Sequence, residues 1–347
     1  MTGLQQSMPG PRSAVTGNPS NPEGLSMPPV SFVVIGLNEE RMIAACLRSV
    51  MDCDHPQDKK EIIYVDSGST DRTLEIVQSL PGVTVFHLND QHPNAAKGRN
   101  VGWQAARGEF VQFLDGDMVM KHDWPKTAQA FMSERDDVAC VFGQVREHVE
   151  RMNIYSRVFD MIWRCEPGPT RTLGGAFLAR RDLLEELGGF DESLRGGEEP
   201  ELASRIRGTE KTIWCLPVPM VVHFSGISTF REYWRRMFTY GFNLAQGRQR
   251  TAGQSASTDA VTSLLKSAAV SWLPLGLLVA ALLSRSWIPA LMGLAIVAAF
   301  VSRVVVRERA GGRALSEGIL YGLHLFVSKF AITYGQATGH LREKERK

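Results

Sequence analysis

The sequence has few cysteines and no excess of either charge. Its five cysteines form no Cys-x-x-Cys pair, so neither a zinc ribbon nor a disulfide framework is indicated, and we expect reduced, mostly buried thiols. The 39 basic and 37 acidic residues nearly cancel, which argues against a nucleic-acid partner. A chain of 347 residues is long enough for one large or two ordinary domains with a sizeable core.

Two other absences concern the ends of the chain. Residues 1–28 contain no apolar run and are rich in Gly, Pro, Ser and Asn, which predicts a disordered arm and not a signal peptide. Near the other end, residues 267–284 and 286–302 contain no charged side chain, and only Arg285 separates them. Each run approaches the ~20 apolar residues of a transmembrane helix. Two in tandem favour membrane helices over a buried hairpin in a soluble core.

Between these ends, continuous apolar runs alternate with segments of helical periodicity. The runs are VSFVVIG, EIIYV, VTVFHL and EFVQFL, starting near residues 30, 61, 83 and 109. Such runs are typical of parallel strands that are covered on both faces. Strands and helices in alternation predict an α/β fold with a mostly parallel sheet, helices on both faces and right-handed crossovers.

Polar clusters follow three of these predicted strands. They are Asn38–Glu39, Asp66–Ser67 and Asp115–Gly116–Asp117. In open α/β sheets ligands bind beyond the carboxyl ends of the strands. We therefore expect the three clusters to converge on one ligand crevice.

The third cluster has the chemistry of a metal site. Asp115 and Asp117 are two apart in extended backbone, so their side chains point the same way, and Gly116 permits close approach of a ligand. Two hard oxygen donors suit Mg²⁺ or Mn²⁺ shared with a diphosphate. The alternative is an ordinary Asp-Gly turn, but the position at a strand end favours the metal.

Five segments in order resemble the family 2 glycosyltransferases, which have the GT-A fold. They are VVIGLNEE, IIYVDSGSTDRT, KGRNVGWQAARGEFVQFLDGD, GGAFLARRDLLEELGGFDE and GGEEPELASRIR. The resemblance covers roughly residues 30–242. It implies an inverting enzyme that transfers a sugar from a nucleotide-sugar, with Mn²⁺ or Mg²⁺ on the diphosphate. UDP is the commonest donor nucleotide in this family.

The resemblance also implies residues for donor binding. Asn38 and Glu39 would line the nucleotide pocket, with Glu39 near the uracil or ribose. Asp66 would bind the base edge, and Lys97 and Arg99 lie where the family places basic residues near the donor. The nucleotide-sugar-binding set implied in this way is Asn38, Glu39, Asp66, Ser67, Lys97, Arg99, Asp115 and Gly116.

The metal and the turn beside it follow from the same likeness. Asp115 and Asp117 would form the DXD motif, with Asp117 the more direct ligand. His223, after the last strand, is a candidate third ligand or diphosphate contact, and a purely structural histidine is the alternative. Gly174 and Gly175 lie where the family keeps a small-residue turn against the donor sugar and the acceptor.

The position of the catalytic base departs from the family pattern. The family usually has Glu-Asp, whose Asp deprotonates the acceptor hydroxyl, whereas this chain has Glu198–Glu199. By position Glu199 is the base, one methylene longer than usual, which leaves open whether Glu198 or Glu199 acts. A carboxylate can remove the proton as the glycosidic bond breaks.

The predicted organisation has four parts: the arm (1–28), a catalytic domain (29–225), an amphipathic helix with a polar linker (226–262) and a membrane region (263–347). Helices are expected at about 264–284, 286–306 and 315–338, the third either interfacial or spanning. Arginines follow the second helix, which places the catalytic domain on the cytoplasmic side of the inner membrane. Arg231, Arg235 and Arg236 could close over the diphosphate or meet anionic headgroups.

Together these features predict an enzyme that extends a polyprenyl-linked or other lipid-linked glycan in exopolysaccharide, capsule or lipopolysaccharide synthesis. No QxxRW element is present, which favours transfer of a single sugar. Two alternatives are a polyprenyl-phosphate sugar synthase and a non-catalytic nucleotide-sugar-binding membrane scaffold. Intact acidic motifs argue against the scaffold.

Overall fold

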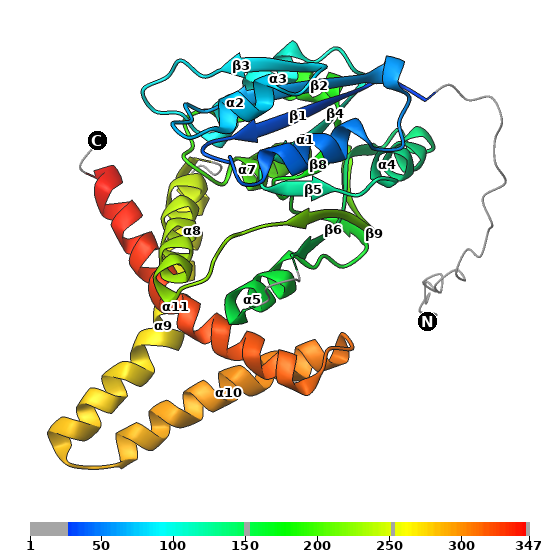
Figure 1. Ribbon diagram of the computed structural model, residues 1–347. Helices are drawn as coiled ribbons and strands as arrows, with labels where there is room; N and C mark the ends of the chain where they lie inside the picture. Colours follow the sequence, from blue (N-terminus) through cyan, green and yellow to red (C-terminus); the bar gives the residue numbers. More distant parts are fainter. Residues whose placement is uncertain (1–26, 149–152, 251–253, 345–347) are drawn as a thin grey trace, which may run out of the picture.

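The computed structural model describes residues 27–148, 153–250 and 254–344, so the predicted N-terminal arm lies almost entirely outside it. A nine-stranded sheet flanked by helices forms one body, and long C-terminal helices extend from one side of it (Figure 1). The strand order is β3-β2-β1-β4-β8-β6-β9-β5, and β7 pairs with β9.

The first half of the sheet is parallel, as predicted. Its strands are β1 (Val30–Gly36), β2 (Lys60–Asp66), β3 (Val83–His87) and β4 (Phe110–Asp115). The pairs β1–β2, β1–β4 and β2–β3 all run in the same direction. Burial on both faces explains the unbroken apolar runs, since Phe32, Val33 and Val34 are successive residues with no exposed surface.

The second half of the sheet is mixed. Its strands are β5 (Met118–Met120), β6 (Val138–Glu147), β7 (Gly168–Thr170), β8 (Phe177–Arg180) and β9 (Thr212–His223). Strand β8 runs antiparallel to both β4 and β6, and β9 runs parallel to β6. The prediction of a mostly parallel sheet therefore holds only for the first four strands. An apolar run signals burial and not direction, so the reversal at β8 has no local signature.

Within the described residues, seven helices precede the C-terminal region. They are α1 (Ile43–Met51), α2 (Thr73–Gln78), α3 (Ala95–Ala105), α4 (Trp124–Ser133), α5 (Ile154–Trp163), α6 (Arg181–Leu187) and α7 (Glu198–Ile206), with a 3₁₀ turn at Gln57–Lys59. Helix α3 starts at Asn94, whose side chain accepts the Lys97 N–H. Helix α7 starts after Gly197, whose φ of 86° suits glycine. Both helices therefore begin at the cleft described below.

Four long helices follow: α8 (Phe230–Arg250), α9 (Gln254–Ser284), α10 (Ile288–Ala310) and α11 (Leu315–Lys344). Helix α9 begins ten residues earlier than predicted and includes part of the expected linker. Among the described helices, one is long and apolar enough to cross a membrane, α10. The apolar part of α9 is the shorter segment Ala268–Ser284, so the membrane helix predicted at about 264–284 is only partly matched.

Helix α11, the third predicted C-terminal helix, packs closely along α8 (Figure 1). A Cβ on Gly241 would lie 2.2 Å from the Ile332 carbonyl oxygen, and one on Gly335 would lie 2.1 Å from that of Phe238. Only glycine allows the two backbones to approach so closely. Residues of α5, α8 and α11 also share a small apolar cluster, formed by Phe159, Ile227, Tyr233, Met237 and Ala331. The C-terminal helices are therefore joined to the sheet domain through α8.

Candidate active site

A cleft of about 430 Å³ opens at the carboxyl ends of β1 and β4. It brings together most of the residues predicted for the site. These are Glu39, Ser67, Arg99, Asp115, Gly116, Asp117, Glu198, Glu199 and His223. The predicted convergence of the Asp115–Gly116–Asp117 cluster with Glu39 and Ser67 is thus present in the structure.

Arg99 of α3 is the centre of the cleft's charge network. Its Nη1 lies 2.5 Å from Glu198 Oε1, and its Nη2 lies 2.8 Å from Asp115 Oδ1 and 3.2 Å from Glu199 Oε1. Only 2% of Arg99 is exposed. Burial alone would lower the pKa of this guanidinium, but the charges of Glu199, Asp115 and Glu198 raise it above its usual range. The arginine is therefore a fixed positive charge among three carboxylates.

The two glutamates at the start of α7 have different environments. Glu198 has a 5% exposed side chain and the shorter contact to Arg99, whereas the Glu199 side chain is 17% exposed. Burial raises the pKa of Glu199 to about 7, against the lowering effect of Arg99. A carboxyl with a pKa near neutrality and access to the cleft is suited to accept a proton.

Asp115 is enclosed by glycines. A Cβ on Gly175 would lie 2.5 Å from Asp115 Oδ2, and the Gly175 carbonyl accepts a bond from Arg99 at 3.4 Å. A Cβ on Gly116 would lie 3.1 Å from Glu39 Cγ. In contrast, a Cβ on Gly174 would have no neighbour within 4 Å. Of the predicted glycine pair, Gly175 is the one that the site requires.

Asp117 and His223 form a second polar group, on the β5 and β9 side. His223 Nε2 lies 3.2 Å from Asp117 Oδ2, and its Nδ1 lies 3.1 Å from Glu147 Oε2. Burial would lower the histidine pKa, but hydrogen bonds to Asp117 and Glu147 raise it to about 9. His223 is therefore held in place between two carboxylates, and its predicted role as a metal ligand stays a prediction.

The donor atoms fit a divalent ion only in part. Asp117 Oδ1 is buried and has no hydrogen-bond partner among the described residues, and Asp115 lies beside it in the cleft. No three Asp, Glu, His or Cys side chains in the described ranges converge to hold a metal by themselves. Mg²⁺ is often held by only one or two carboxylates together with substrate phosphates, and Asp115 and Asp117 could supply two.

Glu39 lies within the electrostatic influence of the aspartate pair, and its predicted place near the base or ribose stays a prediction. Burial raises its pKa to about 7, and the charges of Asp117 and Asp115 add to the effect. Its backbone N–H is fixed by Thr73 Oγ1 at 2.8 Å. A third carboxyl therefore faces the floor of the cleft.

Three of the residues predicted to bind the nucleotide-sugar are not among those lining the cleft, and neither are Gly174 and Gly175. Asn38 has a φ of 59° and accepts the Thr70 N–H at 2.8 Å, joining the loops after β1 and β2. Asp66 is 1% exposed and its Oδ2 accepts the N–H groups of its own loop. Lys97 pairs with Asp90. Asn38 and Asp66 thus shape the loops around the cleft, and Lys97 is engaged outside it.

Sequence reasoning missed other contributors. Asn94 at the start of α3 lines the cleft, Glu147 holds His223, and the Trp163 ring lies edge-on to His223 with centroids 5.5 Å apart. Of the three α8 arginines named from the sequence, Arg236 lines the cleft. The KGRN motif lies within α3 and indicated that this helix borders the donor site. Glu147 and Trp163, in contrast, lie in no local pattern that points to the cleft.

Comparison with known proteins identifies the domain. Residues 31–188 match the model of the family described as "Glycosyl transferase family 2". These residues form a family 2 glycosyltransferase domain. The resemblance stated from the sequence motifs is confirmed.

The sequence relatives of this glycosyltransferase are only partly covered by the chain. The poly(ribitol-phosphate) beta-N-acetylglucosaminyltransferase TarS of Staphylococcus aureus is 36% identical over 107 residues, which are 30% of this chain and 19% of TarS. Glycosyltransferase AglE of Haloferax volcanii is 31% identical over 192 residues, 52% of this chain and 62% of AglE. The poly-beta-1,6-N-acetyl-D-glucosamine synthase of Staphylococcus epidermidis is 27% identical over 177 residues, 48% of this chain and 42% of that enzyme. The chain thus spans less than two thirds of each.

Solved structures agree on the fold. The mannosyltransferase PcManGT from Pyrobaculum calidifontis, in complex with GDP-Man and Mn²⁺, superposes with a TM-score of 0.57 at 19% identity, covering 90% of this chain and 88% of that one. Residues 1–349 of S. aureus TarS in complex with UDP give 0.51 at 19% identity, covering 92% of both chains. The glycosyltransferase domain therefore has the GT-A fold predicted from its motifs.

Proposed function

We propose that this chain is an inverting glycosyltransferase that moves a sugar from a nucleotide-sugar to a membrane lipid-linked glycan in polysaccharide biosynthesis. One observation carries the proposal. The Arg99 guanidinium contacts Asp115 of the donor motif and both glutamates of α7. A donor site and an acidic pair suited to proton removal are thus held at a fixed separation in one cleft.

The donor diphosphate would be held on the Asp115 and Asp117 side of the cleft. Asp117, with a buried unpaired Oδ1, would be the principal metal ligand, and Asp115 would share its charge between the ion and Arg99. A bound Mn²⁺ or Mg²⁺ would neutralise the diphosphate as it leaves. Among the relatives, PcManGT in complex with GDP-Man and Mn²⁺ supports a donor and an ion of this kind. The UDP complex of TarS supports UDP as the nucleotide.

Glu199 would act as the general base. The acceptor hydroxyl gives its proton to the Glu199 carboxylate while its oxygen bonds to the anomeric carbon. The bond from that carbon to the diphosphate oxygen breaks on the opposite side, and the nucleoside diphosphate leaves. Glu198 is less suited because its side chain is more buried and its Oε1 is engaged by the Arg99 guanidinium at 2.5 Å.

The α9–α10 hairpin supports placement at a membrane. Its side chains include Leu282, Leu283 and Trp287 at 73%, 82% and 70% exposure, a degree of apolar exposure that marks an interaction surface. Basic side chains in the last turn of α10, Arg307 and Arg309, agree with a cytoplasmic end. The glycosyltransferase domain would then face the cytoplasm, where nucleotide-sugars are available.

Release of nucleoside diphosphate tests this function. Purified protein with Mn²⁺ and bacterial membrane lipid extract would be offered UDP-, GDP- and dTDP-sugars in turn. We expect release from one donor class that depends on the extract. Release with polyprenyl phosphate alone as acceptor would favour the polyprenyl-phosphate sugar synthase, and donor binding without any release would favour the scaffold.

A further inference from the structure

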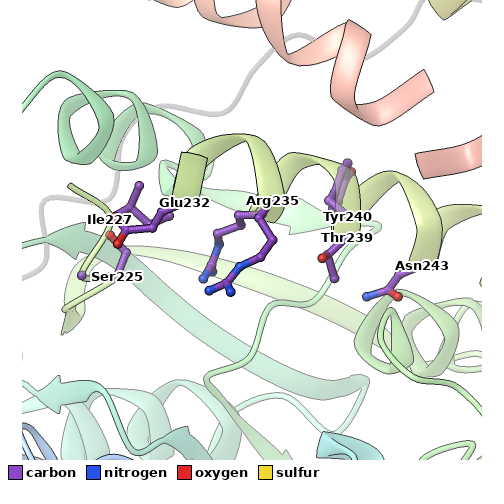
Figure 2. Close-up of a pocket in the computed structure, with 9 residues that line it drawn as sticks. Ser225, Ile227, Glu232, Arg235, Thr239, Tyr240 and Asn243 are labelled. Carbon is purple, nitrogen blue, oxygen red and sulfur yellow. The ribbon is translucent and has the colours of Figure 1, made fainter. Parts of the chain in front are cut away.

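A second cavity, of about 550 Å³, lies between α8 and the loop that follows β9 (Figure 2). The loop contributes Ser225, Gly226 and Ile227. From α8 come residues at positions 232, 235, 236, 239, 240 and 243, a spacing that places them along one face of a helix. Arg235, Thr239 and Asn243 project from the same side of α8 (Figure 2).

The described residues that line this cavity carry a net positive charge, from two arginines and one glutamate. Arg235 and Arg236 are exposed, and neither has a carboxylate partner within the described residues. The cavity's own carboxylate, Glu232, is already engaged, because it accepts the N–H groups of Ser228 at 2.8 Å and Thr229 at 3.0 Å. Two guanidinium groups against one carboxylate favour an anion, and guanidinium geometry matches phosphate oxygens.

The cavity adjoins the donor cleft, and Arg236 lines both. Its guanidinium carbon lies 5.4 Å from the Phe159 ring centroid and 5.8 Å from that of Trp163, which hold it in place. The two cavities also meet next to the acidic pair. Asn243 lines the second cavity and Gly196 lines the cleft, and they are so close that a Cβ on Gly196 would lie 2.0 Å from Asn243 Nδ2. A group bound at Arg235 could thus extend toward Glu199.

We propose that this second cavity is the acceptor subsite and that it binds a phosphate or diphosphate group of the acceptor through Arg235 and Arg236. This inference rests on the proposed function and adds to it the chemical class of the acceptor. Helix α8 also contacts α9 and α11 (Figure 1), so a lipid-linked phosphate bound here would have apolar helices beside it. A water-soluble phosphate acceptor has the same headgroup chemistry, and the experiment separates the two.

Arg235 is the residue to change, because Arg236 also lines the donor cleft. Arg48 of α1 is the control, since it is exposed, lies in a helix and is not among the residues lining either cavity. Binding of farnesyl diphosphate and of inorganic pyrophosphate would be measured by calorimetry on the full chain, with EDTA present so that metal-dependent binding at Asp117 is removed. We expect Arg235→Gln to weaken farnesyl diphosphate binding on the order of tenfold and Arg48→Gln to leave it unchanged.

Equal weakening by both variants, or by neither, would overturn the proposal. Tighter binding of farnesyl diphosphate than of pyrophosphate in the wild type would assign a lipid source, and equal affinities would assign a soluble phosphate acceptor. The measurement uses no donor, so it does not depend on sugar transfer. Arg235-dependent binding together with no nucleoside diphosphate release from any donor would reject the proposed function and leave the subsite standing.

Discussion

The Nη1 atom of Arg99 lies 2.5 Å from Glu198 Oε1, although the two residues are 99 positions apart in the chain. Helix α3 supplies the arginine and the start of α7 supplies the glutamate. Because the same guanidinium reaches Asp115, a single side chain sets the separation between the donor motif and the acidic pair. Changes at this residue should therefore affect both stability and catalysis.

Replacing Arg99 with Met should destabilise the fold. The substitution leaves Asp115, Glu198 and Glu199 without a cation, and loss of one partner of a buried ion network costs about 3–5 kcal/mol. Urea unfolding should show this loss. The stability of Arg99→Lys should lie between those of the wild type and Arg99→Met, because lysine retains the charge but not the planar guanidinium that can bond two carboxylates at once. Arg72→Ala is the control, since its pair with Glu75 is exposed and should change stability little. A midpoint for Arg99→Met equal to that of the control would contradict the network.

Gly175→Ala should reduce activity while its neighbour Gly174→Ala should not. The added methyl at Gly175 would lie 2.5 Å from Asp115 Oδ2, whereas at Gly174 it would meet no atom within 4 Å. Displacement of Asp115 should raise the donor KM and lower kcat at least tenfold, because small misplacements in a site are costly. The donor KM and kcat of the two variants would be compared by steady-state kinetics. Equal values would show that Asp115 can move without loss of activity.

The pH dependence should report Glu199. Burial raises its pKa to about 7, and a base acts only when it is deprotonated, so kcat should increase as pH rises through about 7 and then level off. Glu199→Asp, which introduces the residue usual in the family, should keep part of the activity because it keeps the carboxylate. A Glu198→Gln variant that retains the same acid limb would support the assignment. An acid limb that disappears in Glu198→Gln would transfer the base role to Glu198.

Membrane association should depend on the tip of the α9–α10 hairpin. Leu282→Asp with Leu283→Asp places two charges on side chains that are 73% and 82% exposed, and charge in the bilayer core is costly. Cosedimentation with phosphatidylglycerol-containing vesicles should fall strongly for this pair. Leu37→Asp, an exposed leucine of the sheet domain, should bind vesicles like the wild type. Unchanged binding of the double variant would exclude insertion of the hairpin tip.

The sequence predicted those parts of the structure that depend on local pattern. The four parallel strands were readable because residues such as Phe32 and Val33 alternate faces that are both buried. The reversal of β8, in contrast, depends on which neighbours it pairs with. Helix α5 was missed because its packing against α8 and α11, through Phe159, is a long-range contact.

The candidate site was predictable to a similar extent. Asp115, Asp117 and Arg99 lie in recognisable motifs, so their presence in the cleft could be expected. The inward hydrogen bonds of Asp66 and the pairing of Lys97 with Asp90 could not, since each depends on the conformation of a loop. Arg231, Arg235 and Arg236 could be named from the sequence, but only the fold of α8 decides that Arg236 is the one that lines the cleft.

Sugar transfer by variants of the acidic residues tests the central claim most directly. Labelled nucleotide-sugar of the active donor class would be incubated with Mn²⁺, lipid extract and wild-type, Glu199→Gln, Glu198→Gln or Asp117→Asn protein, and label in the lipid fraction would be counted. We predict a loss of at least about 100-fold for Glu199→Gln, the scale of general base catalysis. Asp117→Asn should also lose the response to added Mn²⁺, while Glu198→Gln keeps most of its transfer. Full transfer by Glu199→Gln together with an unchanged metal response in Asp117→Asn would contradict the account.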